Sequence, residues 1–144
     1  MSYTSRVSER MYPLAIHYAD GRGAGNHDSA YVSLQDYHRA WLVINVGDQE
    51  GAATFDAQIR QAQDATGTGV KAITGKAITQ LTGAGSDLVC IELQTEELDV
   101  DNGFEHVSFR ITIAGGAVIY SAILYGLTSR FKPVPTTNWA EIVG

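Results

Sequence analysis

The chain has 144 residues, of which 44% are hydrophobic and 18% are charged, and it carries a formal net charge of −6. This length is typical of one domain. The acidic balance argues against a free-standing nucleic-acid-binding protein, which would normally be basic. The single cysteine excludes a disulfide framework and a cysteine-based zinc site. No apolar run reaches the roughly 20 residues of a membrane span, and the polar residues 1–9 do not resemble a signal peptide.

The first third of the chain predicts one long apolar strand preceded by shorter ones. Pro13–Ala19 and Ala30–Gln35 are the short candidates. Ala40–Val46 is apolar on both faces, which is typical of a strand in the centre of a sheet. Trp41 lies in this run, and we interpret it as a core residue.

The middle of the chain alternates between apolar and polar residues. In 54–61, Phe55, Ala57 and Ile59 share one face while polar side chains share the other, which predicts a half-buried strand. Two shorter strands are predicted next, over 70–74 and 76–82. We expect a turn or bulge at Gly75 to bring their isoleucines to the same core.

The last third predicts three more strands. Leu88–Gln94 is largely apolar, so we interpret its Cys90 as an inert core residue. Glu105–Ile113 alternates again. Ala117–Leu127 is apolar on both faces, as in a central strand or a strand covered by a neighbouring subunit. Gly115-Gly116, between these last two runs, is a two-residue hairpin signal.

About eight strands with frequent turn signals predict an all-β fold, either an antiparallel β-sandwich or a jelly-roll-like barrel. We place this domain at residues 13–130, between an N-terminal arm (1–12) and a C-terminal arm (131–144). Pro133 and Pro135 favour an extended C-terminal arm. Trp139 on that arm either folds back on its own domain or anchors in a partner's pocket, and the sequence leaves both open.

The sequence contains no recognisable catalytic arrangement, so we predict no enzyme activity and no cofactor. Gly21–Gly25 lacks the helix that must follow a phosphate-binding loop, and we interpret it as a surface loop. The acidic segment 96–101 fails the EF-hand spacing; a different cation site there stays open, although a solvated loop is favoured. No zinc-binding spacing is found among the histidines, which are His17, His27, His38 and His106.

The order of these segments resembles a known family. Ala40–Val46 ends in Gly47, the alternating strand 54–63 leads into a Gly/Thr-rich turn and a strand at 64–73, and Ala117–Gly126 leads into the terminal segment 130–135. This pattern, over residues 30–135, is similar to small β-sandwich structural proteins of tailed bacteriophages, especially head decoration (cement) proteins. It is a pattern rather than a motif.

The resemblance implies a structural protein on the capsid surface of a virion. Such a protein binds the lattice of the major capsid protein as a homo-oligomer, most often a trimer, and stabilises the expanded shell. It binds neither nucleic acid nor a membrane. The resemblance implies partner-binding residues on both arms, namely Tyr3, Arg6, Arg10, Tyr12, Phe131 and Trp139.

Two alternatives stay open at this stage. One is another structural protein of the phage head–tail connector or tail. The other is a carbohydrate-binding β-sandwich module, which would use exposed aromatic side chains such as Tyr31, Tyr37, Tyr120 or Tyr125.

Overall fold

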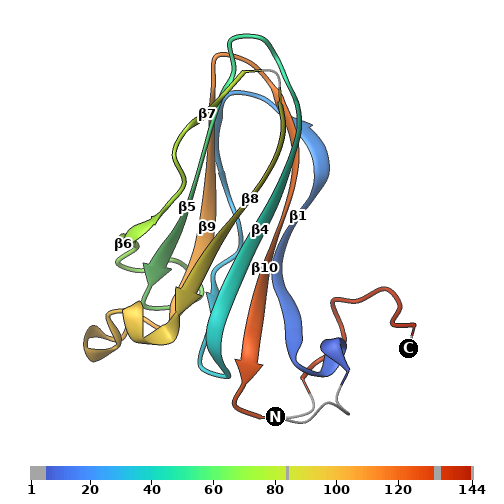
Figure 1. The fold of residues 1–144 in the computed structure, drawn as a ribbon. Coiled ribbons are helices and arrows are strands. Elements are labelled where there is room, and N and C mark those ends of the chain that lie inside the picture. The colour runs from blue at the N-terminus through green and yellow to red at the C-terminus, as the bar shows by residue number, and fades with distance from the viewer. Residues whose placement is uncertain (1–5, 84, 132–133, 144) are drawn as a thin grey trace.

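A computed structural model describes residues 6–83, 85–131 and 134–143 (Figure 1). Three short 3-10 helices occur among them, η1 (Val7–Glu9), η2 (Thr95–Glu97) and η3 (Val100–Asn102). The ten strands in these residues are β1 (Met11–Arg22), β2 (Gly25–Asp28), β3 (Val32–Ser33), β4 (Tyr37–Gln49), β5 (Thr54–Ala62), β6 (Lys71–Ala77), β7 (Leu81–Thr82), β8 (Gly85–Gln94), β9 (His106–Ala114) and β10 (Val118–Ser129).

The strands form two antiparallel sheets that pack face to face, so the predicted β-sandwich is confirmed. Sheet A has the order β1-β10-β4-β8. Sheet B has six strands, with β2-β9-β5-β6 as its main path, β3 beside β9 and β7 beside β5. Successive strands mostly change sheet, so that neighbours in a sheet come from distant parts of the sequence (Figure 1).

The core lies between the two sheets and explains the sequence periodicity. In β5, Phe55, Ala57 and Ile59 face inward and are at most 2% exposed, as their alternation predicts. β10 and β4 lie in the middle of sheet A, in agreement with their apolar character. β10 sends Tyr120, Ala122 and Leu124 into the core, while the residues between them face outward.

The backbone at Gly75 agrees with the predicted bulge. It lies within β6 at a φ of +78°, a backbone conformation that glycine adopts readily. The pairing of β5 with β6 shifts its register here. Ile73 on one side of the bulge is buried, and Ile78 beyond it also packs against the core.

Three sequence predictions are wrong. Gly115-Gly116 does not make a hairpin, because β9 belongs to sheet B and β10 to sheet A; Gly115, at a φ of +76°, turns the chain between the layers. Cys90 is exposed rather than buried in the core. Trp41 is only partly buried, since the inward residues of β4 are its even-numbered neighbours Ala40 and Leu42.

The C-terminal segment packs against its own domain. Val134 is 5% exposed and contacts Tyr12 and Tyr37. The Tyr12 hydroxyl lies 2.9 Å from Thr137 Oγ1, and the Asn138 amide donates to the Pro13 carbonyl at 2.7 Å. These contacts hold residues 134–139 beside the start of β1.

Candidate functional site

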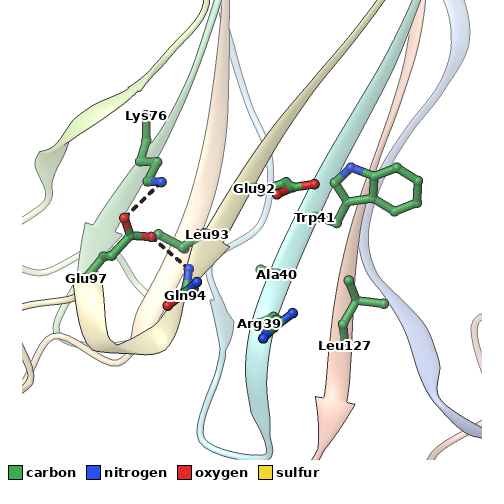
Figure 2. A pocket seen from close by; sticks show the side chains of 9 residues that line it. All are labelled: Arg39, Ala40, Trp41, Lys76, Glu92, Leu93, Gln94, Glu97 and Leu127. Carbon is green, nitrogen blue, oxygen red and sulfur yellow. Dashed lines mark hydrogen bonds and ion pairs between the residues drawn. The ribbon is translucent and has the colours of Figure 1, made fainter.

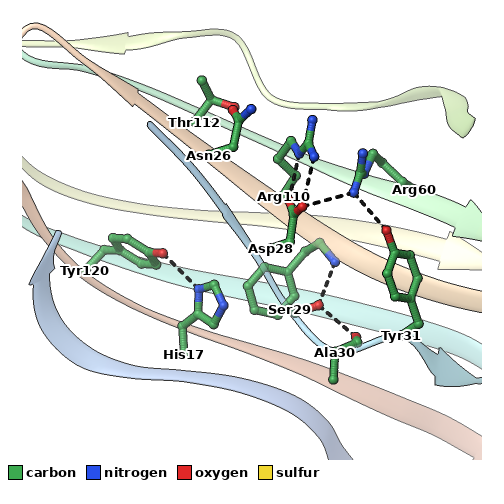
Figure 3. Close-up of polar contacts among 11 residues, drawn as sticks. His17, Asn26, Asp28, Ser29, Ala30, Tyr31, Arg60, Arg110, Thr112 and Tyr120 are labelled. Atoms are coloured by element: carbon green, nitrogen blue, oxygen red, sulfur yellow. Dashed lines mark hydrogen bonds and ion pairs between the residues drawn. The ribbon is translucent and has the colours of Figure 1, made fainter. Parts of the chain in front are cut away.

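On the outer face of sheet B, polar side chains from neighbouring strands bond to one another (Figure 3). Asp28 accepts a bidentate pair of hydrogen bonds from Arg110, at 2.7 and 2.8 Å. Arg60 lies 3.4 Å from the same carboxylate and donates to the Tyr31 hydroxyl at 3.1 Å. The hydrogen bonds from Arg110 are the main reason that the pKa of Asp28 is lowered. The guanidinium groups of Arg60 and Arg110 therefore share one carboxylate on this face.

His17 lies on the other side of sheet B, between the layers (Figure 3). Its Nδ1 is 2.8 Å from the Tyr120 hydroxyl, and its ring meets the edge of Phe109 at a centroid distance of 4.6 Å. Desolvation lowers the pKa of His17 and raises that of Tyr120 to about 12. The pair packs within the sandwich and shows no arrangement with a nucleophile. The tyrosine, one of the candidate sugar-binding aromatics, is 1% exposed.

The outer face of sheet A carries an apolar patch that reaches all four strands, with Glu92 and Arg39 at its margin. We call it the apolar face and define it by Ile16, Tyr18, Trp41, Val43, Cys90, Ile123 and Tyr125. The pairing register places Ile16, Ile123, Val43 and Cys90 in one row across all four strands. Tyr125 and Trp41 form the next row, with their rings 6.0 Å apart. Unlike the outer face of sheet B, this surface has an uncharged centre.

A hollow of about 380 Å³ lies at the β8 side of the apolar face (Figure 2). Trp41, Glu92 and Arg39 are among its lining residues. At its far side, Glu97 pairs with Lys76 at 3.0 Å and accepts a hydrogen bond from the Gln94 backbone at 2.8 Å. The hydrogen bond from Gln94, followed by that from Lys76, lowers the pKa of Glu97.

A second surface occupies the end of the sandwich where both terminal segments lie (Figure 1). We call it the terminal end and define it by five exposed apolar residues, Val7, Val100, Phe131, Ile142 and Val143. Val100 and Phe131 line a hollow of about 450 Å³. The other three line a hollow of about 560 Å³. Phe131 is 70% exposed, which is unusual for so large an apolar side chain.

The residues predicted to bind a partner are only partly brought together. Arg6 and Trp139 line the larger hollow of the terminal end, and Phe131 lines the other. Arg10 lies between η1 and β1 and is half-buried. Tyr12 belongs to β1 and is 7% exposed, which leaves little of it for a partner. Tyr3 lies outside the described residues.

Sequence reasoning missed Val7, Val100, Ile142 and Val143. Val7 and Val100 are single apolar residues between polar ones, and Ile142 and Val143 form a short pair; only the fold brings them to one end. The sequence signal for the apolar face is that β4 and β10 are apolar on both sides, although this signal does not tell which side lies outside.

The acidic segment at 96–101 is largely occupied by its own contacts. Lys71 pairs with Asp99, whose carboxylate also accepts two bonds from the Asn102 amide, and these contacts lower the pKa of Asp99. Across residues 6–83, 85–131 and 134–143, no group of three or more histidine, cysteine, aspartate or glutamate side chains is placed to hold a metal ion. In the same residues, no helix is long and apolar enough to cross a membrane.

Comparison with known proteins yields a fold but no family. No family model and no curated protein matches the chain. A chain from the structure of infectious bursal disease virus, Gt strain, is similar with a TM-score of 0.52 and 11% identity, over 86% of this chain and 33% of that chain. The Gx strain of the same virus gives a TM-score of 0.50 with 11% identity, over 85% and 33%. The present chain thus spans about a third of the length of these neighbours.

A third neighbour is the SPBc2 prophage-derived protein YomS, with a TM-score of 0.43 and 8% identity, over 79% of this chain and 92% of that chain. This TM-score is too low to support an argument. The identity to the two viral chains is also low, so that their likeness concerns the fold alone. It agrees with the β-sandwich that the sequence predicts.

Proposed function

We propose that the chain is a structural protein of a virus particle, which binds the outside of a capsid lattice as a homo-oligomer and stabilises it. The observation that carries this proposal is the terminal end, where exposed apolar side chains from both terminal segments and from η3 gather around two hollows. The sandwich fold, which the chain shares with chains of infectious bursal disease virus, supports it.

The physical basis of this function is differential binding. A protein that binds the expanded shell and not the unexpanded one stabilises the expanded state by mass action. Burying exposed apolar side chains in a lattice pocket supplies the free energy, and a few large side chains usually dominate it. Phe131 is the best-placed anchor at the terminal end, since it is large, apolar and 70% exposed.

The contacts of the C-terminal segment hold the terminal end in place for lattice binding. The bonds from Thr137 and Asn138 to the start of β1 fix the backbone beside Trp139. Trp139 is half-buried in the larger hollow, with Arg6 near its rim. A surface fixed before binding loses less conformational entropy on binding. We therefore assign Trp139 to shaping the terminal end and Phe131 to lattice contact.

Co-sedimentation with capsids tests the proposal. The protein is mixed with expanded, undecorated shells of the phage that encodes it, and with unexpanded shells as the control. Saturable binding to expanded shells alone is expected. Phe131→Ser should weaken this binding about 30-fold or more, which corresponds to about 2 kcal/mol. Gln58→Ser is the control, because Gln58 lies on the outer face of β5 in sheet B, outside both the terminal end and the apolar face.

Carbohydrate binding is the second candidate function, and the hollow beside Trp41 favours it. An indole ring flanked by Glu92, Gln94 and Arg39 offers an apolar platform with hydrogen-bonding groups at its margin. A glycan screen at millimolar sugar concentration, with Trp41→Ala as the negative control, tests this role. If no glycan binds the parent chain while failing to bind the variant, the carbohydrate-binding role is refuted.

A further inference from the structure

We infer that the apolar face of sheet A binds a second copy of this chain, with the two faces stacked around a two-fold axis that runs along the strands between β10 and β4. This deepens the homo-oligomeric part of the proposed function by naming the surface and its partner. It can fail while lattice binding succeeds, since the two are measured separately.

The two outer faces of the sandwich differ in their side chains. On sheet B, Arg60 and Arg110 both contact Asp28, so charged side chains that pair within one chain occupy this outer face. At the corresponding positions of sheet A, the central row consists of Ile123, Val43 and Cys90. The C-terminal segment adjoins the β1 side of this face, where Trp139 lines one hollow with Tyr125 and another with Ile16 and Tyr18. Contiguous exposed apolar surface of this kind marks interaction sites.

The residues of β10 and β4 that face outward form rows that suit a two-fold axis. Four pairs run down β10 and β4, namely Ser121 with Asn45, Ile123 with Val43, Tyr125 with Trp41, and Leu127 with Arg39. The first is polar, the next two are apolar, and the last is mixed.

A two-fold axis parallel to the strands keeps each row at the same height in both copies. It places β10 of one copy over β4 of the other, so that each row faces the same row of the second copy. Ile123 then contacts Val43 of the second copy, and Tyr125 contacts Trp41. The polar pair Ser121 and Asn45 faces its own equivalent. The row of Ile123 continues on both sides into Ile16 and Cys90, which are apolar or weakly polar. The face is therefore complementary to itself, as an interface of identical patches must be.

A stable pair must bury enough surface on each copy. A stable interface takes about 800 Å² from each partner. That is a tenth of the 7980 Å² surface of this chain. The residues of the apolar face come from all four strands of sheet A, so a stacked pair uses the full width of this sheet. Aligned sheet faces pack about 10 Å apart through interdigitating side chains, as in the core of a sandwich.

Sedimentation velocity over a concentration range tests the inference with the full chain alone. The expected result is a reversible change from a 15.5 kDa monomer to a particle of twice that mass. Ile123→Lys and Val43→Lys each place two charges near the axis of the pair, and should raise the dissociation constant at least about 100-fold. Gln58→Lys is the control, because it adds the same side chain to the outer face of β5 in sheet B. Far-UV circular dichroism and thermal unfolding establish that each variant is folded.

Cys90 gives a second, independent readout, since it is exposed and is the only cysteine in the sequence. Its reaction with a thiol reagent should slow as the parent chain is concentrated and should not slow in Ile123→Lys. A parent chain that stays monomeric to about 100 µM, or that forms a trimer, would overturn the inference. It would also fail if folded Ile123→Lys and Val43→Lys variants associate as the parent does. If a glycan binds at Trp41 while the chain stays monomeric, the apolar face is a sugar-binding surface and not an interface between two copies.

The two failures are distinguishable. A monomeric parent chain that still binds expanded shells overturns the paired arrangement and keeps the lattice function. A dimer that binds no shell keeps the paired arrangement and removes the lattice function. The mass also separates this pair from the trimer that the family resemblance implies.

Discussion

Strand β10 allows a direct test of which side of sheet A faces the core. Leu124 and Ile123 are adjacent, apolar and similar in size, but Leu124 is fully buried while Ile123 is half-buried on the apolar face. Leu124→Ala removes contacts from the core and leaves a cavity, which costs about 3 kcal/mol within the usual range of about 2–5 kcal/mol. Ile123→Ala should cost about 1 kcal/mol or less in the monomer, because water already reaches this side chain.

The measurement is urea unfolding followed by circular dichroism, at concentrations low enough to keep the chain monomeric. For a chain of this length, 3 kcal/mol corresponds to a fall in Tm of about 10 °C. A loss of 3 kcal/mol is a large share of the roughly 5–15 kcal/mol that stabilises a typical domain. Equal losses for the two variants, or a larger loss for Ile123→Ala, would refute the inward orientation of the even-numbered residues of β10. A one-residue register slip would produce that reversed result.

Three further predictions concern ion pairing, protonation and backbone shape. The ion pair of Asp28 stabilises the fold above the ordinary Asp pKa of 3.8, and this stabilisation is lost as pH falls through the lowered pKa of the folded state. Asp28→Asn should abolish this pH-dependent part of the stability, which urea midpoints measured from pH 7 down to pH 3 check. An unchanged pH profile would contradict the role of the Arg110 pair. The lowered pKa of His17 means that the unfolded chain binds the proton first, so stability should fall as pH drops below 6.5. His17→Gln should remove that fall between pH 7.5 and 5.5, and an identical slope in both proteins would count against it. Gly115→Ala should destabilise by about 2 kcal/mol or more, since its φ is +76° and the new Cβ would meet the Ala52 carbonyl oxygen. Gly51→Ala, where the space is open, should leave thermal unfolding unchanged, and equal effects would refute the argument.

The strands that have one wet face could be predicted well from the sequence. In β5 and β9 every second residue is apolar, because one face packs on the core and the other meets water. This alternation establishes both the strand and the direction of its side chains. The β-sandwich class followed from the number of such segments and the turns between them.

The strands that are apolar on both faces could not be oriented in this way. In β4 the core residues alternate with Trp41 and Val43, so composition alone does not say which set is inside. Cys90 pairs with Val43 across β4 and β8, and it shares the outward direction of that residue. The error at Trp41 and the error at Cys90 therefore have one cause, which is the apolar outer face of sheet A.

The connections between strands depend on long-range pairing that local signals do not contain. Gly115-Gly116 supplies a tight turn, as predicted, but the turn leads from sheet B to sheet A instead of back along the same sheet. The terminal end is similar. Val100 and Phe131 are far apart in the sequence and line one hollow only because the sandwich places them together, and Val7 likewise lines a second hollow with Ile142 and Val143.

Co-sedimentation with expanded capsids, comparing the parent chain with Phe131→Ser, tests the central claim most directly. We expect saturable binding of the parent to expanded shells, no binding to unexpanded shells, and a loss of about 30-fold or more in affinity for the variant. A folded parent chain that binds neither shell would contradict the capsid-lattice function, and equal binding of parent and variant would contradict the role of the terminal end.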